Sequence, residues 1–334
     1  MNEGILSAIG HTPLVRMTRL FKDQPFDFYV KLESFNPGGS MKDRSAATII
    51  SQAIASGEVG PGTTVIESSS GNMGVGLAQV CTYHGLRFVC VVDAKTTTQN
   101  IRLLEAYGAE IDVVTEPDPE TGEFLKARLD RVQTLLAATP QGFWPNQYAN
   151  CANPYAHRQT MGEIAARLGG KVDYLFCATS TCGTLRGCAE YVRDEGMGTT
   201  IIAVDAVGST IFGGDCGKRL IPGHGAAVRP ALFQPGLARR CVHVTDLDCV
   251  IGCRRLARQE AILTGGSGGG VIMAVESIKE SIAPGATCVA ILADRGERYL
   301  DTIYSDMWVR QHFGSVSYLW RDTSKDQVCV TTTF

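Results

Sequence analysis

Residues 36–44 read Asn-Pro-Gly-Gly-Ser-Met-Lys-Asp-Arg and contain Lys42, the residue around which the rest of the chain is interpreted. The proline and the two glycines set a tight turn, and a helical pattern follows it. A lysine at such a junction lies near the positive end of the backbone dipole, which favours the neutral amine. A neutral amine can attack a carbonyl carbon and form a Schiff base. For Lys42 alone, a solvated lysine at a helix start is the simpler interpretation, so the loops further along decide.

Short apolar stretches alternate with helical patterns, which indicates an α/β fold with parallel-rich open sheets covered by helices. Buried strands are expected at residues 64–67, 87–92, 111–114, 174–178, 200–204 and 288–292. Helices are expected at residues 74–84, 99–107 and 124–138. The length of 334 residues suits two domains. We expect a small mobile domain at 43–148, a large cofactor-binding domain at 1–42 with 149–312, and a tail at 313–334.

Three glycine-rich segments, at residues 68–76, 180–187 and 265–270, are predicted to be loops that share one site with Lys42. Ligands of open α/β sheets bind at the carboxyl ends of the strands, where such loops lie. The loop Ser180-Thr181-Cys182-Gly183-Thr184 offers hydroxyls and helix N-terminal N–H groups to an anion. A Walker lysine is absent, so a small organic phosphate fits better than a nucleoside triphosphate. A simple helix cap is the alternative.

The other two segments suit the remaining parts of a flat cofactor. Ser69, Ser70, Gly71 and Asn72 offer hydroxyls and N–H groups to a carboxylate, and the Asn72 amide can bond a phenolic oxygen; helix capping is the alternative. The run at 265–270 lets backbone approach a flat ligand closely, with Ser267 as its hydrogen-bonding side chain; a flexible linker is the alternative. Together with a Schiff-base lysine and a phosphate loop, these groups describe pyridoxal 5'-phosphate.

The order and spacing of these motifs resemble the β family of pyridoxal-phosphate enzymes, fold type II (tryptophan synthase β-like), which includes cysteine synthase and cystathionine β-synthase. The resemblance spans about residues 5–308, with markers Ile-Gly-His-Thr-Pro-Leu-Val at 9–15 and Asp-Arg-Gly-Glu-Arg-Tyr-Leu at 294–300. It implies a Schiff base on Lys42, which then handles the α-proton of the substrate. Further implied contacts are Asn72 to the ring hydroxyl, Ser180 to Thr184 around the phosphate, Ser267 to the pyridine nitrogen, and Ser69 to Asn72 around the substrate α-carboxylate.

Three further segments, at 146–150, 204–213 and 304–308, resemble a narrower subgroup, the N-(2-amino-2-carboxyethyl)-L-glutamate synthases of 2,3-diaminopropionate, siderophore and antibiotic biosynthesis. The resemblance implies that O-phospho-L-serine loses phosphate to give an aminoacrylate, to which the amine of L-glutamate adds. Arg128 and Tyr148 match subgroup residues and would hold an anionic substrate group, with Ser180 near the leaving phosphate. For Arg128, a solvated helix face is the alternative.

Other functions remain open at this point. An ordinary cysteine synthase would use O-acetylserine or O-phosphoserine with sulfide and would need no carboxylate clamp. A serine or threonine dehydratase would release an oxoacid without a second substrate. A catalytically silent homologue would only bind the cofactor or an amino acid, although Lys42, Asn72 and Ser267 argue against this.

Composition excludes several other classes. The net charge is −3, with no basic cluster for nucleic acid. No membrane span or secretory signal is evident, so we expect a cytoplasmic protein whose twelve cysteines are reduced. Cys249 and Cys253 are one helical turn apart, but no second pair has ligand spacing, so no metal is expected. The family resemblance implies a homodimer.

Overall fold

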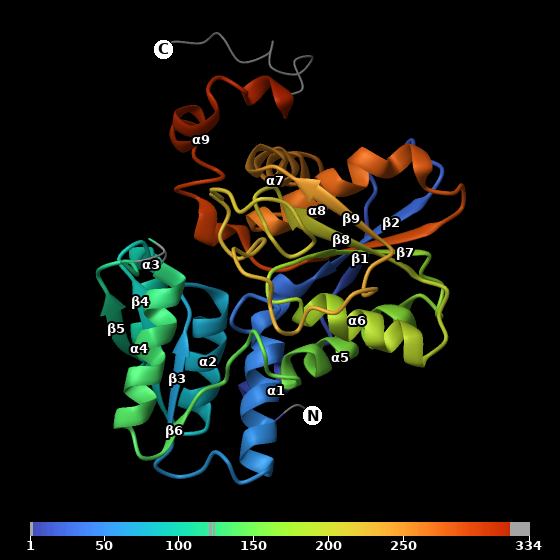
Figure 1. Ribbon diagram of the computed structural model, residues 1–334. Helices are drawn as coiled ribbons and strands as arrows, with labels where there is room; N and C mark the ends of the chain where they lie inside the picture. Colours follow the sequence, from blue (N-terminus) through green and yellow to red (C-terminus); the bar gives the residue numbers. More distant parts are fainter. Residues whose placement is uncertain (1–2, 120–121, 123, 321–334) are drawn as a thin grey trace, which may run out of the picture.

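The computed structural model describes residues 3–119, 122 and 124–320. Within these residues, six strands form a larger sheet in the order β1-β2-β10-β7-β8-β9 (Figure 1). Their bounds are β1 (Leu14–Arg16), β2 (Asp27–Leu32), β7 (Tyr174–Ala178), β8 (Thr200–Ala206), β9 (Arg240–Val244) and β10 (Thr287–Leu292). β1 runs antiparallel to β2, and the other pairs are parallel.

Four strands of the same described part form a second sheet in the order β5-β4-β3-β6, and all of its pairs are parallel. Their bounds are β3 (Thr64–Ser68), β4 (Arg87–Asp93), β5 (Glu110–Val114) and β6 (Gly142–Phe143). The helices between them are α2 (Asn72–Tyr83), α3 (Thr98–Ala106) and α4 (Phe124–Ala138). These strands all lie between residues 64 and 143, inside the predicted small domain; the exact domain limits stay a prediction.

Helices cover both faces of the larger sheet (Figure 1). One face carries α5 (Ala152–Arg167) and α6 (Gly183–Asp194), and the other carries α7 (Asp246–Glu260) and α8 (Gly266–Ile278). Strand β10 is apolar from Cys288 to Leu292 because both of its faces are covered. Val289 and Ile291 pack into the core beneath α5 and α6, whereas Cys288, Ala290 and Leu292 pack into the core beneath α7 and α8.

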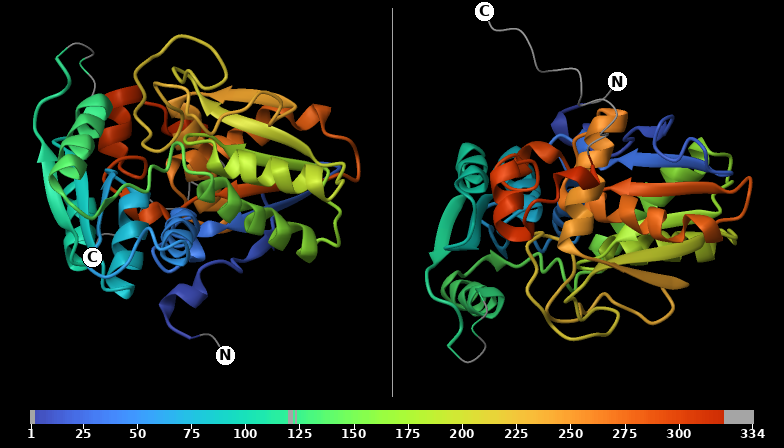
Figure 2. Two further views of the ribbon diagram at one scale, coloured as in Figure 1. Left: turned by 60° about the horizontal axis from the view of Figure 1, so that its bottom comes forward. Right: turned by 90° about the horizontal axis from the view of Figure 1, so that it is seen from above.

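Helix α1 (Lys42–Ala55) lies between the two halves of the molecule (Figures 1 and 2). Its buried apolar side chains, including Ile49 and Ile50, belong to the core of the smaller sheet, and the helix packs against both α2 and α5. The first residue of α1 is Lys42, so the predicted turn-to-helix junction is confirmed. Lys42 therefore lies where the two sheets meet.

Helix α9 (Asp306–Phe313) follows the last strand, and Trp320 is buried in the core of the larger sheet. Within the tail predicted at 313–334, the described part ends at Trp320 and contains a short 3-10 helix at Ser317–Leu319; residues 321–334 lie outside the described residues. None of the helices in the described ranges is long and apolar enough to cross a bilayer.

The predicted loop at residues 265–270 is wrong, because α8 already begins at Gly266. Its glycines permit a close crossing of two helices rather than a flexible connection. A Cβ atom at Gly269 would overlap the carbonyl oxygen of Cys249 on α7, and one at Gly252 of α7 would overlap the carbonyl oxygen of Gly269. Backbone contact between α7 and α8 therefore requires glycine on both sides.

Candidate active site

The register of the larger sheet brings the Lys42 turn beside the segment after β10. Leu32 ends β2 opposite Leu292, which ends β10, so both following segments emerge at the same edge. The N–H of Met41 donates to the carbonyl of Ala293 at 2.8 Å. Gly39 has a φ of 84° and closes the turn, a conformation that favours glycine. The half-buried Lys42 is thereby held beside Asp294.

This setting changes the acid–base behaviour of Lys42. Burial lowers the pKa of its amine, while the nearby carboxylate of Asp294 acts in the opposite direction. A lysine with a lowered pKa carries a larger fraction of neutral amine near neutral pH, which is the nucleophilic form. The prediction that Lys42 forms a Schiff base has a physical basis in this site, and its role stays a prediction.

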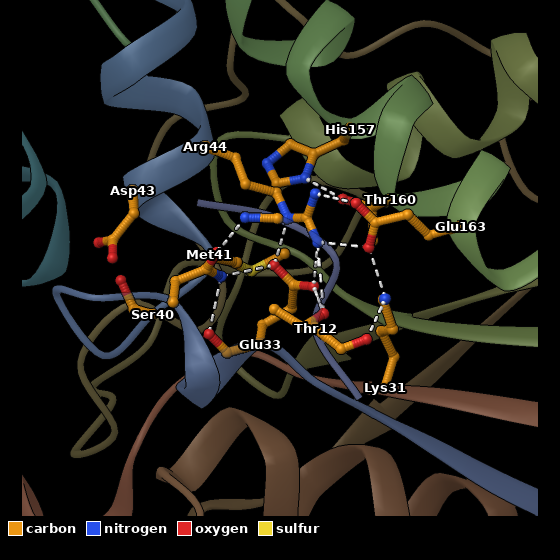
Figure 3. Close-up of polar contacts among 12 residues, drawn as sticks. Thr12, Lys31, Glu33, Ser40, Met41, Asp43, Arg44, His157, Thr160 and Glu163 are labelled. Carbon is orange, nitrogen blue, oxygen red and sulfur yellow. Dashed lines mark hydrogen bonds and ion pairs between the residues drawn. The ribbon is translucent and has the colours of Figure 1, made fainter. Parts of the chain in front are cut away.

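A buried ion network anchors the base of helix α1 (Figure 3). The fully buried Arg44 pairs with Glu33 at 2.6 Å and with Glu163 at 2.7 Å, and Lys31 pairs with Glu163 at 2.6 Å. Two cations thus face two carboxylates, and the Thr12 hydroxyl also donates to Glu33 at 2.7 Å. Burial would raise the pKa of Glu163, but hydrogen bonds from Arg44 and Lys31 lower it to about 2. The network fixes Arg44, two residues after Lys42.

The predicted phosphate loop joins β7 to α6, which begins at Gly183. The first-turn N–H groups of a helix have no intrahelical acceptor, so they suit a phosphate. Cys182 has a φ of 65°, which turns the chain into the helix. Its thiol is buried, and burial raises its pKa to about 12, so it stays neutral and unreactive near neutral pH.

The phosphate loop is tied directly to the Lys42 helix through Asn153, which the sequence analysis did not identify. The buried Asn153 donates to the Thr181 hydroxyl at 3.2 Å and accepts from the Ser45 hydroxyl at 2.8 Å. A Cβ atom at Gly183 would overlap the Asn153 side chain, which explains glycine there. On the other side of the loop, the Thr184 hydroxyl contacts the sulfur of Met41 at 3.8 Å. Lys42 and the loop therefore form one site.

The loop from Ser69 to Asn72 joins β3 to α2, as predicted. The Ser69 hydroxyl accepts from the N–H of Gly74 at 2.9 Å and from that of Gly71 at 3.3 Å, so it caps the helix. The carbonyl of Ser70 accepts from Asn100 at 2.9 Å. Asn72 begins α2 and reaches the larger half, where its amide nitrogen donates to Asp294 at 2.7 Å. The carboxylate-binding role of this loop stays a prediction.

Ser267 lies in the first turn of α8 and is buried. The residue two positions earlier, Gly265, donates its N–H to the carbonyl of Asp294 at 3.4 Å. Asp294 therefore contacts the segments that carry Asn72 and Ser267 and lies beside Lys42. The sequence marker at 294–300 contained this residue, yet its pattern gave no sign that the carboxylate lies between three segments distant in sequence.

Arg128 and Tyr148 lie close together, as their predicted shared role requires. Arg128 is on α4, its side chain is only 12% exposed, and its Nη1 lies 3.3 Å from Asp93 of β4. The solvated-face alternative for Arg128 is therefore wrong. Burial raises the pKa of Tyr148, while the charge of Arg128 and the hydroxyl of Ser180 act against this shift. Ser180 belongs to the phosphate loop, so the Tyr148 side chain is influenced by groups from both segments.

Glu67 holds the segment that carries Tyr148 through two hydrogen bonds. This buried carboxylate on β3 accepts from the Trp144 indole at 3.1 Å and from the N–H of Gln147 at 3.3 Å. Burial raises its pKa to about 7, against these hydrogen bonds. Glu67 is thus a second residue of the site region that the sequence analysis missed, because an isolated glutamate in a strand carries no motif.

Glu67 predicts a pH-dependent stability. Because the folded protein binds this proton more tightly than the unfolded chain, stability should fall as pH rises from about 4.5 to 7, by about 3 kcal/mol for this group alone. Urea unfolding across this range should show a flatter profile for Glu67→Gln. The exposed Glu58→Gln is the matched control and should keep the wild-type slope. Equal slopes for wild type and Glu67→Gln would contradict the prediction.

The described residues fit pyridoxal phosphate. A half-buried lysine with a lowered pKa begins α1, and α1 is linked through Ser45 and Asn153 to a helix N-terminus suited to phosphate. The Asn72 amide and the Ser267 hydroxyl lie on neighbouring segments joined by Asp294. Lys42 would bind the cofactor covalently, and Ser180 to Thr184 would hold its phosphate.

Comparison with known proteins agrees with this fit. The family model described as "Pyridoxal-phosphate dependent enzyme" matches residues 5–294. The chain is 43% identical over 308 residues to N-(2-amino-2-carboxyethyl)-L-glutamate synthase of Ralstonia nicotianae, a match that covers 92% of this chain and 91% of that protein.

Solved structures share the fold. An O-ureido-L-serine synthase superposes with a TM-score of 0.85 at 31% identity, covering 95% of this chain and 98% of that one. A cysteine synthase from Entamoeba histolytica gives a TM-score of 0.84 at 31% identity, covering 91% of each chain. The fold is therefore that of fold type II enzymes, as predicted. The chain belongs to the family of pyridoxal-phosphate-dependent enzymes and is a β-replacement enzyme of that family.

Proposed function

We propose that the enzyme joins O-phospho-L-serine and L-glutamate to give N-(2-amino-2-carboxyethyl)-L-glutamate and phosphate. The C–O bond of phosphoserine breaks, a C–N bond to the glutamate amine forms, and that amine gives up a proton. Bound pyridoxal phosphate supplies the electron sink for this exchange at the β-carbon. The proposal extends to a role in 2,3-diaminopropionate supply for siderophores or antibiotics, in a cytoplasmic homodimer.

The observation that carries the proposal is the incompletely paired guanidinium of Arg128. Its Nε and Nη1 atoms are buried without a hydrogen-bond partner among the described residues, although Asp93 lies 3.3 Å from Nη1. A buried guanidinium normally has its donors satisfied, so these N–H groups suit an incoming anion. Both proposed substrates carry anionic groups beyond the amino acid moiety, whereas sulfide does not need such a clamp. The 43% identical synthase adds support.

Each residue then has a proposed task. Lys42 takes the α-proton of phosphoserine and returns it to the product. The loop from Ser69 to Asn72 holds the α-carboxylate, and Ser180 lies near the leaving phosphate. Arg128 and Tyr148 hold an anionic substrate group. Exclusion of water protects the reactive product of phosphate loss from hydrolysis.

The deciding experiment incubates the holoenzyme with O-phospho-L-serine and L-glutamate and measures phosphate and the condensed amino acid. Both products should form together. Phosphate release without condensed product would sink the proposal, and formation of cysteine with sulfide but no reaction with glutamate would instead support a cysteine synthase, which the similar Entamoeba histolytica structure keeps as the second candidate.

Replacing Arg128 by glutamine is expected to raise the KM for phosphoserine, for glutamate or for both by roughly tenfold or more, because a charge-assisted hydrogen bond is lost. Steady-state kinetics check this, and Arg128→Lys should recover part of the loss. Arg131→Gln is the matched control, since Arg131 lies on the same helix but pairs with Asp112 at the surface. Unchanged KM values for both substrates in Arg128→Gln would remove Arg128 from the proposed site.

A further inference from the structure

Asp294 lies at a junction that neither the family comparison nor the proposed function explains. It follows β10 and forms an antiparallel bridge with Ser40 of the Lys42 turn. Its carbonyl accepts from the N–H of Gly265 and, at 3.4 Å, from the Thr264 hydroxyl. Its side chain accepts a hydrogen bond from Asn72, the first residue of α2, at 2.7 Å. One buried residue therefore connects the three segments that carry Lys42, Asn72 and Ser267.

The amide of Asn72 is held at both ends. Its nitrogen donates to Asp294 Oδ2, and its oxygen accepts from the guanidinium of Arg298. Arg298 is fixed in turn by the carbonyl of Gly38, at 2.6 Å. A carboxylate only accepts and a guanidinium only donates, so the two partners decide which end of the amide faces which way. The Asn72 nitrogen carries a second N–H. Because the amide group is planar, fixing the first N–H on Asp294 also fixes the direction of the second.

The carboxylate of Asp294 is itself held in place. The Tyr299 hydroxyl donates to the same Oδ2 at 2.6 Å. The other oxygen, Oδ1, is buried and has no hydrogen-bond partner within residues 3–119, 122 and 124–320. It lies against Gly265, where a Cβ atom would overlap it. A buried carboxylate with an unpaired oxygen is costly to keep, which argues for a task beyond packing.

We propose that Asp294 is a positioning residue of the cofactor site, which orients the Asn72 amide so that its second N–H reaches the ring oxygen of the cofactor. Arg298 completes the clamp from the other end of the amide. The inference rests on the proposed placement of the cofactor ring at Asn72. Asp294 and Arg298 are the two residues that set the orientation of that amide. Both act through Asn72 and not directly on the substrate.

The test reads the bound cofactor itself, in the absence of any amino-acid substrate. A hydrogen bond to the ionised ring oxygen favours the ionised form, so its loss moves the proton onto that oxygen. In Asp294→Asn, the cofactor absorbance should move to shorter wavelength and the cofactor Kd should rise about tenfold. The exposed Glu297→Gln changes the charge equally, three residues away, and should leave both values as in wild type.

A double-mutant cycle separates positioning from a general structural effect. If Asp294 acts through Asn72, then Asp294→Asn should change neither absorbance nor Kd further in an Asn72→Ala background. An undiminished effect in that background, or wild-type values for Asp294→Asn alone, would overturn the inference. If urea titrations show that Asp294→Asn does not fold, Arg298→Gln is used in its place. The same changes in absorbance and cofactor Kd are expected, and the same two outcomes would overturn the inference. Because no substrate is present, these results stand whether or not glutamate proves to be the second substrate.

Discussion

Lys42→Ala should lower kcat for β-replacement by roughly a thousandfold or more, because both the nucleophilic amine and the proton-transferring group are lost. Lys42 begins α1, beside Asp294, in a setting where burial lowers the pKa of its amine. The remaining site should still bind the cofactor through the loop at 180–184. The variant should therefore be folded and able to take up cofactor, but nearly inactive.

Borohydride reduction followed by peptide mass spectrometry gives the structural readout. In the wild type, the cofactor mass should be found on the peptide that contains Lys42, and in Lys42→Ala no lysine should carry it. The matched control is Lys171→Ala, which removes an exposed lysine and should retain both activity and labelling. Labelling of a different lysine in the wild type would refute the assignment of Lys42.

Arg44→Met should lower the free energy of unfolding by about 3–5 kcal/mol, because removing one member of a buried ion network leaves uncompensated charge. In this variant Lys31 would be the remaining cation of the network of Lys31, Glu33, Arg44 and Glu163 that faces its two carboxylates (Figure 3). Urea unfolding at neutral pH measures the loss. The surface ion pair of Arg131 provides the control: Arg131→Met should cost less than about 1 kcal/mol.

A second substitution tests whether charge balance is the cause. Glu33→Gln added to Arg44→Met restores the balance of one cation and one carboxylate, so the double variant should lose less stability than the two single losses added together. Strict additivity would contradict the network interpretation.

Acid should weaken the same network. Glu163 has a pKa lowered to about 2, so its stabilising contribution is complete above about pH 4.5 and is lost as pH falls toward 2.

Local sequence patterns predicted much of the fold because several strands, such as β7 and β10, contain a continuous run of apolar residues. The strand predicted at 174–178 is confirmed residue for residue, and that at 288–292 begins one residue earlier. β2 (Asp27–Leu32) was not predicted, because its alternating pattern contains Lys31. That lysine is tolerated in a buried strand because its ammonium pairs with Glu163, which is 132 residues away in the sequence, and also donates to the carbonyl of Thr12. No local pattern contains such a partner.

The site shows the same division. Lys42, Asn72, Ser180 and Ser267 lie in glycine-rich turns or helix starts that a sequence displays openly. Asp294 and Asn153 acquire their importance only from contacts with several distant segments. The glycine run at 265–270 was predicted to be a loop because glycine disfavours helices, and the reason for the glycines is the partner helix α7.

The close crossing of α7 and α8 has a consequence for engineering this protein. Replacing helical glycine by alanine commonly stabilises an exposed helix by up to about 1 kcal/mol, and a helix start as rich in glycine as that of α8 would attract such a design. At Gly269 the added methyl group would instead push α8 away from α7 and carry Ser267 with it. The stability of the α7–α8 contact and the position of Ser267 therefore depend on the same backbone contact between Gly252 and Gly269. Attempts to stabilise this enzyme should leave both glycines unchanged.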